Sequence, residues 1–575
     1  VFFEGNVTTI RMVKLALMQV FLCNHIVKVM SYVAFNPLSL PRMRKPLKPR
    51  QSILDVEAVA EPMRQTHASQ LNQEFKWRKQ NLQKIKRMIN DNRQEICDAL
   101  RQDLGKEPVE AWSTEAGPVS DEIDFVLKRL HAWMKPNKVS TPIHSAIGFS
   151  QTRKVPLLEP GVLVVGPSNY PILLTLGPAV GSIAAGNPTL IKPSEISSAT
   201  AKLLHDLVSR YMDPSVLQVV QGGADETTQL LQQSWGKVCF TGSTHVGRLV
   251  AEATAQTLTP SILELGGKAP LYVDNAIYNL DIVADRLIFG KTLNTGQTCV
   301  AIDYVLIHKD VADKLLDLMV KAVEKQFGGG PESELGRMVQ VSNAQRQVQM
   351  LQEVEQCNQT QILCGGSQEC RPEERYIAPT IVLNPPLESR LMKEEIFGPV
   401  MAVRIVASRE EAKQFIQNKM PKNPLALYIF TSSDECYEDF VRSIPAGCVC
   451  RNDAVVQFGN NQLPVGGIGT SGWGHHRGKY SFDSFSHERN EFHRSLLTDM
   501  GRLRYHPFHK AKIKATVVQF SIKHLIDIPV LHLRSRWWLW SAVLGGILGS
   551  SIFKRDLLNG IASVLERTAF LLRGL

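Results

Sequence analysis

A cysteine, a glutamate and an asparagine stand in sequence settings that suit thiol chemistry. Cys299 follows the small and polar residues of the segment 294–300 (NTGQTCV), which leave room for a substrate and offer backbone N–H groups to an anion. A cysteine nucleophile needs a route to the thiolate, a base for a second half-reaction and an oxyanion site. Most cysteines are buried small apolar residues, so the residue type alone does not indicate a nucleophile. The hypothesis depends on the sequence around Cys299.

Glu264 is the candidate base. It lies in the apolar run 262–265 (ILEL), directly before two glycines. Burial raises the pKa of a carboxylate towards neutrality, where a general base works best. The alternative is a structural ion pair between Glu264 and Lys268.

Asn169 is the candidate oxyanion donor. It lies in the segment 166–171 (GPSNYP), directly after an apolar run that predicts a strand. In α/β sheets, ligands gather at the carboxyl ends of the strands. The Asn169 amide could therefore donate to an oxyanion, and a plain turn residue is the alternative.

Two further segments indicate a nucleotide cofactor. In residues 240–247 (FTGSTHVG), a strand passes through Gly242 and Ser243 into a helix that contains Gly247, and the free N–H groups of this helix could face a pyrophosphate. Lys192 and Glu195, at the end of an earlier strand, are placed to meet ribose hydroxyls.

Two other patterns are set aside. The G-x-G-x-x-G match at 467–472 does not open a β-α-β unit, so it is not interpreted as a dinucleotide fingerprint. His475 and His476 lack metal-ligand spacing, so we expect them in a solvated loop and predict no metal site. Residues 462–486, rich in Gly, Ser and aromatics, are expected to wind over the site as ordered loop.

Short apolar runs alternate with helical periodicity around these residues. Strands are predicted at 161–166, 189–192, 217–220, 237–241 and 262–265, and helices within 71–104, at 199–211 and at 246–256. This alternation predicts a parallel sheet between layers of helices, the usual frame for a nucleotide cofactor. A second α/β segment runs from about 267 to 444, and Cys448 and Cys450 are expected on one face of a strand.

Composition supports a folded enzyme of more than one domain. The 575 residues are 44% hydrophobic and 21% charged, and the ten cysteines form no C-x-x-C pair, which indicates a reducing compartment. The net charge of +10 comprises +6 on residues 1–55, +8 on 491–575 and −4 on the body between them. Basic ends on an acidic body favour a membrane-attached enzyme over a nucleic-acid binder.

The combined motifs resemble the aldehyde dehydrogenase superfamily. They are 263–268 (LELGGK), 296–299 (GQTC), 240–243 (FTGS), 394–399 (EEIFGP) and 192–195 (KPSE). The segments 299–306 (CVAIDYVL) and 478–487 (GKYSFDSFSH) look like the class 3 branch, which includes microsomal fatty aldehyde dehydrogenases. The resemblance covers about residues 60–507.

The resemblance implies a Rossmann-like NAD-binding domain, an α/β catalytic domain and a small β oligomerisation element. The expected parts are an extension outside the fold (1–55), the NAD(P)-binding domain (56–266), the catalytic domain (267–444), a bridging and oligomerisation segment with site-covering loops (445–507), and a basic linker with a C-terminal membrane anchor (508–575). A homodimer is implied. The apolar run 15–23 leaves a signal peptide or a dispensable extension open for the N-terminal part.

The resemblance also implies a mechanism. Cys299 would attack the aldehyde carbon, the Asn169 amide and the Cys299 N–H would hold the oxyanion, and Glu264 would activate the water that releases the acid. Glu395 would hold the nicotinamide ribose with Phe397 beside it. Lys192, Glu195 and Ser243 would serve the adenosine and pyrophosphate end. Like charge at Glu195 favours NAD over NADP.

Two departures from the family pattern, and two other interpretations, stay open. Ser168 stands where the family usually has Trp, and Val465 where it usually has Phe, which would widen the substrate tunnel or loosen positioning of the substrate.

A non-catalytic binding or structural member of the fold is the first alternative function. An acylating enzyme that uses coenzyme A is the second, disfavoured because Glu264 is retained.

The C-terminal tail predicts membrane attachment. Residues 537–553 are uncharged, with three Trp at one end and basic residues on both sides. A helix packed on the enzyme body is the alternative. The class 3 resemblance favours an anchor in the endoplasmic reticulum membrane with the catalytic body facing the cytosol, and lipid-derived aldehydes as substrates; a cytoplasmic enzyme is the other possibility.

Overall fold

A computed structural model describes residues 54–141, 148–496 and 505–507, and the α/β fold belongs to the unit that begins at Asp55. The side chain of Asp55 accepts the N–H of Ala58 and so caps the first described helix, α2 (Val56–Ser69). Of the predicted extension (1–55) only Leu54 and Asp55 are among these residues, and Asp55 belongs to the fold as the cap of α2; the predicted anchor at 537–553 lies outside the described residues.

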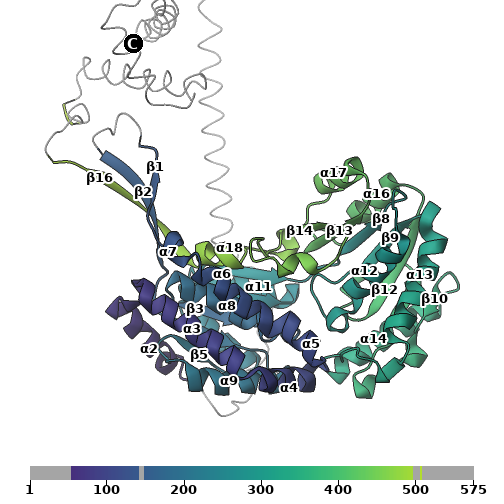
Figure 1. The fold of residues 1–575 in the computed structure, drawn as a ribbon, viewed down its shortest axis with the longest axis horizontal. Coiled ribbons are helices and arrows are strands. Elements are labelled where there is room, and N and C mark those ends of the chain that lie inside the picture. The colour runs from purple at the N-terminus through teal and green to yellow at the C-terminus, as the bar shows by residue number, and fades with distance from the viewer. Residues whose placement is uncertain (1–53, 142–147, 497–504, 508–575) are drawn as a thin grey trace, which may run out of the picture. The chain divides into compact units, whose positions relative to one another are not determined.

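The first sheet has six strands in the order β15-β7-β6-β3-β4-β5. Figure 1 labels β3 and β5 of this sheet. Five strands of the sheet are parallel and confirm the predicted strands: β3 (Val162–Val165), β4 (Thr189–Lys192), β5 (Leu217–Val219), β6 (Lys237–Gly242) and β7 (Ser261–Leu265). The two-residue β15 (Gly472–Trp473) pairs antiparallel with β7. Because a parallel sheet is covered on both faces, its strands appear in sequence as continuous apolar runs.

Four helices connect these strands. They are α8 (Leu173–Ala185), α9 (Ser198–Tyr211), α10 (Ala224–Gln232) and α11 (Thr244–Gln256), of which α9 and α11 were predicted. The chain proceeds from β3 to β4 and β5 on one side, and then crosses to β6 and β7 on the other. Right-handed crossovers therefore place α8 and α9 on one face of the sheet and α10 and α11 on the opposite face. The strand order reverses between β3 and β6, which is where such sheets bind ligands.

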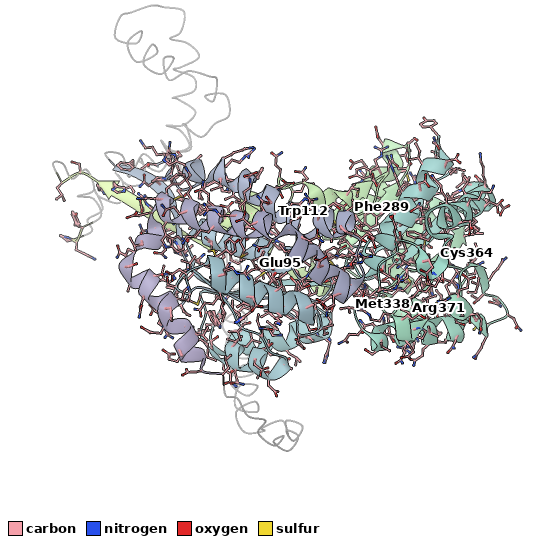
Figure 2. All side chains as sticks on the ribbon, turned by 60° about the horizontal axis from the view of Figure 1, so that its bottom comes forward. Glu95, Trp112, Phe289, Met338, Cys364 and Arg371 are labelled. Carbon is pink, nitrogen blue, oxygen red and sulfur yellow. The ribbon has the colours of Figure 1, made fainter. Side chains whose placement is uncertain are left out.

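An N-terminal helical layer covers α8 and α9. Its elements are α3 (Phe75–Asp91), α4 (Arg93–Leu104), α5 (Pro108–Ala111), the π-turn η2 (Trp112–Ala116), α6 (Gly117–Leu127) and α7 (Leu130–Trp133). Helices α3 and α6 pack on α8, and α4 packs on α9, in one shared apolar cluster. The apolar periodicity of 71–104 thus predicted α3 and α4 correctly. Glu95 and Trp112 lie in this layer (Figure 2).

The second sheet has seven strands in the order β10-β11-β12-β9-β8-β13-β14, all parallel except β10. The strands are β8 (Pro270–Val273), β9 (Tyr304–His308), β10 (Gln361–Cys364), β11 (Thr380–Leu383), β12 (Val400–Val406), β13 (Ala426–Phe430) and β14 (Cys448–Arg451). Strand β14 carries the sheet beyond residue 444. Cys448 and Cys450 both lie on it and contact the same apolar cluster, as expected.

Helices cover both faces of this second sheet. One apolar cluster includes α12 (Leu280–Thr292) and α13 (Lys309–Phe327), and another includes α14 (Val341–Glu355), α16 (Arg409–Lys419) and α17 (Asp434–Ser443). The short helix α15 (Arg390–Lys393) packs on α14. Met338, Cys364 and Arg371 lie in this part of the molecule (Figure 2). The observed architecture is the predicted α/β class with two sheets layered between helices.

A third sheet joins segments that are far apart in the sequence. Strand β2 (Gly148–Pro156) pairs antiparallel with β1 (Asn137–Val139) and, over nine residues, with β16 (Ser486–Arg494) (Figure 1). This is the small β element that the resemblance implied. Two of its three strands, β1 and β2, come from residues before the first α/β strand, β3.

The segment 462–486 is more structured than predicted. Instead of continuous loop it contains the 3-10 turn η9 (Gly469–Ser471), strand β15 and helix α18 (Gly478–Ser484), which packs on α8. Among the residues that the structure describes, no helix is both long and apolar enough to cross a membrane.

Candidate active site

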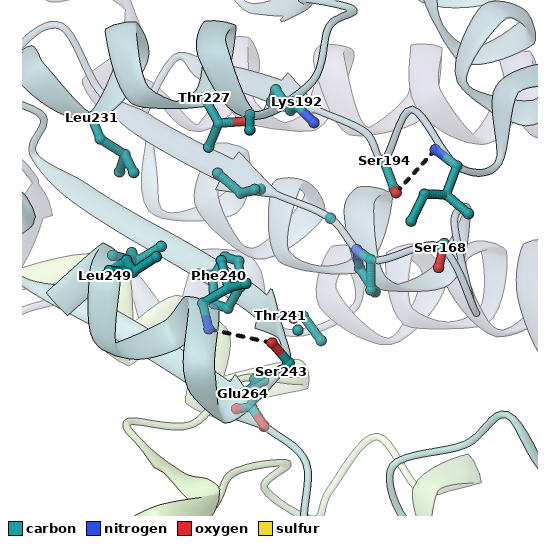
Figure 3. Close-up of a pocket in the computed structure, with 18 of the residues that line it drawn as sticks. Ser168, Lys192, Ser194, Thr227, Leu231, Phe240, Thr241, Ser243, Leu249 and Glu264 are labelled. Carbon is teal, nitrogen blue, oxygen red and sulfur yellow. Dashed lines mark hydrogen bonds between the residues drawn. The ribbon is translucent and has the colours of Figure 1, made fainter. Parts of the chain in front are cut away.

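A cavity of about 1120 Å³ opens at the point where the strand order of the first sheet reverses (Figure 3). It brings together all but one of the predicted site residues: Asn169, Lys192, Glu195, Gly242, Ser243, Glu264, Cys299, Glu395 and Phe397. Gly247 does not line it. A Cβ on Gly247 would lie 2.4 Å from the Leu265 side chain, so this glycine lets α11 approach β7 closely.

Cys299 is positioned by a strained loop after α12. Asn294 and Thr295 have φ of 55° and 57°, and Gly296 follows with φ of 72°. A Cβ on Gly296 would lie 2.3 Å from the carbonyl oxygen of Gly398, so only glycine allows this approach. Positive φ in residues other than glycine is uncommon and clusters at functional sites. The Asn-Thr-Gly sequence suits this loop because asparagine and glycine tolerate the left-handed region best.

Hydrogen bonds join the Asn169 loop to the Cys299 loop. The Asn169 amide donates to the carbonyl of Gln297 at 2.8 Å, and the Asn294 amide donates to the carbonyl of Asn169 at 2.8 Å. Buried Gln297 donates to the carbonyls of Asn294 and Arg337. Since an amide nitrogen carries two hydrogens, Asn169 keeps one donor beyond its bond to Gln297.

A buried ion pair supports the loops that carry Asn169 and Cys299. Lys106 and Glu115, both completely buried, are paired at 2.8 Å. Glu115 also accepts the N–H groups of Ile172 and Leu173 at the start of α8. Burial raises the pKa of Glu115, and Lys106 opposes this effect.

Tyr170 connects this ion pair to the residue before the cysteine. The Lys106 ammonium lies 4.3 Å from the centre of the Tyr170 ring. The Tyr170 hydroxyl is 2.7 Å from the Thr298 hydroxyl. Packing and hydrogen bonds therefore run from the ion pair to the neighbour of Cys299.

Glu264 is buried on β7, as predicted, and is not paired with Lys268. Burial raises its pKa to about 8. Lys268 instead pairs with Asp303 at 3.1 Å and donates to the carbonyls of Leu391 and Glu394. The structural ion pair considered as the alternative is therefore absent, and Oε1 of Glu264 has no hydrogen-bond partner.

The prediction for His476 is wrong. It was expected in a solvated loop, but its side chain is buried, and its Nε2 lies 4.0 Å from Oε1 of Glu264. His475 is exposed and packs edge-on against Tyr480. Burial and then the charge of Arg477 lower the pKa of His476 to about 3.

The thiol of Cys299 is held in its protonated form. Burial raises its pKa, and the carboxylates of Glu395 and Glu264 raise it further. A thiolate is the nucleophilic species, so proton removal must accompany attack. Of the three glutamates that line the cavity, Glu264 and Glu395 are the two that act electrostatically on this thiol.

Glu395 reaches the cavity from the segment after α15. Its Oε1 accepts the N–H of Gly267, and a Cβ on Gly266 would lie 2.2 Å from its Oε2, so a larger residue at 266 would displace the Glu395 carboxylate from its present position. Burial raises the pKa of Glu395 to about 8. Phe397 follows with a φ of 53°, a strained value for an aromatic residue.

Lys192 and Glu195 form an ion pair at the end of β4. Their Nζ and Oε2 atoms are 2.9 Å apart, with Lys192 buried and Glu195 half exposed. Burial is the largest single effect and opposes ionisation of Glu195, but the hydrogen bond from Lys192, a backbone hydrogen bond and the charge of Lys192 together outweigh it, so the pKa of Glu195 lies below its ordinary value.

The start of α11 forms the opposite wall. The Ser243 hydroxyl accepts the N–H of Val246 at 3.3 Å and caps this helix (Figure 3). Apolar side chains of Val246 and Leu249, both exposed, line the wall beyond it. A helix N-terminus beside an apolar wall can take both parts of a nucleotide, the phosphate and the base.

Comparisons with known proteins agree with this geometry. Residues 49–490 match the model of the aldehyde dehydrogenase family. The chain belongs to this family.

Several relatives are named as members of family 3, in agreement with the class 3 resemblance. Aldehyde dehydrogenase family 3 member H1 of Arabidopsis thaliana is 38% identical over 462 residues, which cover 80% of this chain and 92% of the relative. The 4,4'-diaponeurosporen-aldehyde dehydrogenase of Staphylococcus aureus is 36% identical over 448 residues, 78% of this chain and 95% of the relative. A substrate-bound structure of Staphylococcus aureus AldH is 34% identical, covers 82% of this chain and all of its own, and superposes with a TM-score of 0.77.

Members of the aldehyde dehydrogenase family are NAD(P)-dependent oxidoreductases, and the walls of this cavity fit such a cofactor. The orphaned carboxylate oxygen of Glu264, the glycines at 242 and 266 and the N-terminus of α11 supply polar groups and space. Within the described residues, no cluster of His, Cys, Asp or Glu could hold a metal ion.

The sequence motifs of this aldehyde dehydrogenase missed its supporting residues. Tyr170 stands next to Asn169 in the same motif, and this adjacency was its only signal. Lys106, Glu115 and His476 belong to no motif and acquire their place through contacts between distant segments. Arg346, from α14, is another supporting residue outside the motifs. It donates to the carbonyls of Glu395 and Ile396 and so holds the segment that carries Glu395.

Proposed function

We propose that this enzyme oxidises medium- and long-chain aldehydes to carboxylic acids through a thioester on Cys299. The observation that carries the proposal is that Cys299, Asn169 and buried Glu264 line one cavity. Nucleophile, oxyanion donor and base are the three roles that acyl chemistry on a thiol requires.

The residues would act in sequence. The Cys299 thiol would release its proton to solvent in the cavity while its sulfur bonds to the aldehyde carbon, and the carbonyl oxygen would take up negative charge. The Asn169 amide and the Cys299 backbone N–H would stabilise that oxygen. A nicotinamide held by Glu395 and Phe397 would supply the hydride acceptor for the oxidation to the thioester. Glu264 then removes a proton from water, whose oxygen attacks the thioester carbon, and the sulfur leaves.

The variant Glu264→Gln tests the assignment of the base. Glutamine keeps the size of the side chain but cannot accept the proton, so we expect a rapid burst of NADH followed by slow turnover. Stopped-flow absorbance of NADH would measure both phases, with Cys299→Ala as the control that abolishes both. Loss of the burst in Glu264→Gln would show that Glu264 acts before hydride transfer.

The cavity residues would hold the cofactor in the predicted manner. Lys192 and Glu195 would meet the adenosine ribose, the N-terminus of α11 after Gly242 and Ser243 the pyrophosphate, and Glu395 and Phe397 the nicotinamide ribose. The ionised carboxylate of Glu195 disfavours a 2′-phosphate, so we propose NAD over NADP. Equal kcat/KM values for the two cofactors would refute this preference.

The preference for long substrates is supported by two small side chains. Ser168 lines the cavity, and Val465 forms an isolated β-bridge with His476, which is next to Glu264. The Staphylococcus aureus relative is named for 4,4'-diaponeurosporen-aldehyde. We expect Val465→Phe to lower kcat/KM for decanal more than for propanal, and an equal effect on both would refute the wide-tunnel interpretation.

Membrane attachment belongs to the same proposal, which places the enzyme as a homodimer on the endoplasmic reticulum membrane with its body in the cytosol. It rests on the sequence of residues 537–553 and on their basic flanks. Truncation after Ser521 should release a soluble enzyme that still oxidises short aldehydes. Recovery of the full-length chain in the cytosolic supernatant would refute the anchor.

A further inference from the structure

His476 and Glu264 present two buried polar atoms to each other. Oε1 of Glu264 and Nε2 of His476 are 4.0 Å apart, both side chains are at most 5% exposed, and neither atom has a hydrogen-bond partner. A buried polar atom without a hydrogen-bond partner is destabilising, so two such atoms that face each other favour the small shift that joins them.

The backbone holds His476 in this place. Its N–H donates to the carbonyl of Val465 at 2.9 Å, and its carbonyl accepts the N–H of Val465 at 3.0 Å. Four residues earlier, Gly472 pairs with Glu264 itself in the β15–β7 ladder. A Cβ on Gly472 would lie 1.9 Å from the carbonyl oxygen of Leu263, so the segment that carries His476 is fixed against β7.

The other titratable groups near this pair come from several elements. Cys239 on β6, Cys299 after α12 and Cys448 on β14 act electrostatically with Glu264. All three have a pKa raised by burial and stay neutral. His476, with its Nε2 at 4.0 Å from Oε1, is the nitrogen donor that the fold places beside Glu264.

The groups that act on His476 keep it neutral. Arg477 and His475, on its own segment, lower its pKa together with burial, and Arg477 interacts in turn with buried Glu122 of α6. A neutral imidazole donates from one ring nitrogen, and a hydrogen bond to Glu264 requires the tautomer that carries this hydrogen on Nε2. It can therefore donate to the carboxylate without taking its proton.

We propose that His476 is a positioning residue for Glu264, donating a hydrogen bond from Nε2 that orients the carboxylate and favours its ionised form during thioester hydrolysis. This rests on the assignment of Glu264 as the base. A donor to the charged form of a carboxylate lowers its pKa and so opposes the effect of burial. The base then exists as carboxylate over a wider pH range.

The test compares three variants of the full chain. His476→Phe removes the donor and keeps an aromatic ring, His476→Gln keeps an N–H donor, and His475→Gln changes the exposed neighbour. For each, the NADH burst and the slower hydrolysis rate are measured across the acidic and alkaline limbs of the pH profile with hexanal. Melting temperatures report whether each variant is folded, and His476→Met replaces the phenylalanine variant if that one does not fold.

We expect the acidic limb of the hydrolysis profile to move up by about one pH unit in His476→Phe, which is a tenfold lower rate on that limb. The burst and the KM should stay unchanged. His476→Gln should restore most of the profile, and His475→Gln should match the wild type.

Two results would overturn the inference. One is a His476→Phe profile that superimposes on the wild type while Glu264→Gln still stalls hydrolysis. The other is equal impairment in His476→Phe and His476→Gln. If Glu264→Gln itself hydrolyses normally, the assignment of the base fails, and the role of His476 fails with it.

Discussion

The buried pair Lys106–Glu115 gives a sharp prediction about stability. Lys106→Met removes the ammonium and leaves a completely buried carboxylate. Breaking a buried pair from one side costs about 3–5 kcal/mol. Because Glu115 keeps two backbone N–H donors at the start of α8, we expect a cost at the lower end of this range, a loss of about 3 kcal/mol in the free energy of unfolding at about pH 8.

The cost should depend on pH in a defined direction. Burial already raises the pKa of Glu115 in the folded protein, and without Lys106 it rises further. The folded variant then holds a proton that the unfolded chain releases above about pH 4.3. The free energy of unfolding of the variant therefore falls as the pH rises from the pKa of Glu115 in the unfolded chain to its higher pKa in the folded variant. The fall is up to about 1.4 kcal/mol per pH unit.

Thermal unfolding at about pH 5.5 and about pH 8 would measure this effect. The compact unit that begins at Asp55 is larger than the domains of about 150–250 residues in which 1 kcal/mol shifts the midpoint by about 2–4 °C, so we expect a loss of less than about 6 °C at about pH 8 and a smaller loss at about pH 5.5. Lys106→Met/Glu115→Gln should recover most of the loss and its pH dependence. Lys86→Met, which breaks the partly exposed pair with Asp124, is the control and should cost about 0–1 kcal/mol. Equal midpoints for Lys106→Met and Lys86→Met at the higher pH would refute the reasoning.

Two further predictions concern the catalytic loops. Asn169→Ala should lower kcat by about 10²–10³-fold with a small change in KM, because an oxyanion donor acts mainly in the transition state; steady-state kinetics would measure this, and a change confined to KM would contradict it. Gly472→Ala should abolish thioester hydrolysis or folding, because the added Cβ would lie 1.9 Å from the Leu263 carbonyl next to Glu264; a soluble variant with normal turnover would contradict it.

The strands of the first sheet were predictable because each is covered on both faces and therefore appears as an apolar run. Residues at the carboxyl ends of these strands, such as Asn169 after β3 and Lys192 at the end of β4, could be predicted to lie near one another because parallel strands end at the same edge of the sheet. Glu264 could be recognised as buried because it interrupts such a run. Local sequence was sufficient for these features because burial and strand direction leave a direct pattern.

Contacts between distant segments left no such pattern. Strand β2 pairs with β16, which lies far along the chain, and β15, only two residues long, extends the sheet beside Glu264. Periodicity records which face of a segment is buried, but not which other segment covers it. For that reason the segment 462–486 was predicted as loop, although it contributes a strand and a helix.

The two adjacent histidines differ in a placement that the sequence alone does not determine. His475 and His476 have the same chemistry, and neither stands at metal-ligand spacing, so the sequence treats them alike. Successive side chains of an extended segment point in opposite directions, and the bridge to Val465 decides which one faces inward. The sequence determined which residues are the candidate nucleophile, base and oxyanion donor, and the sheet that brings them together. Only the tertiary structure placed one histidine against Glu264 and left its neighbour in solvent, because that choice depends on how β15 and its following turn pack on β7.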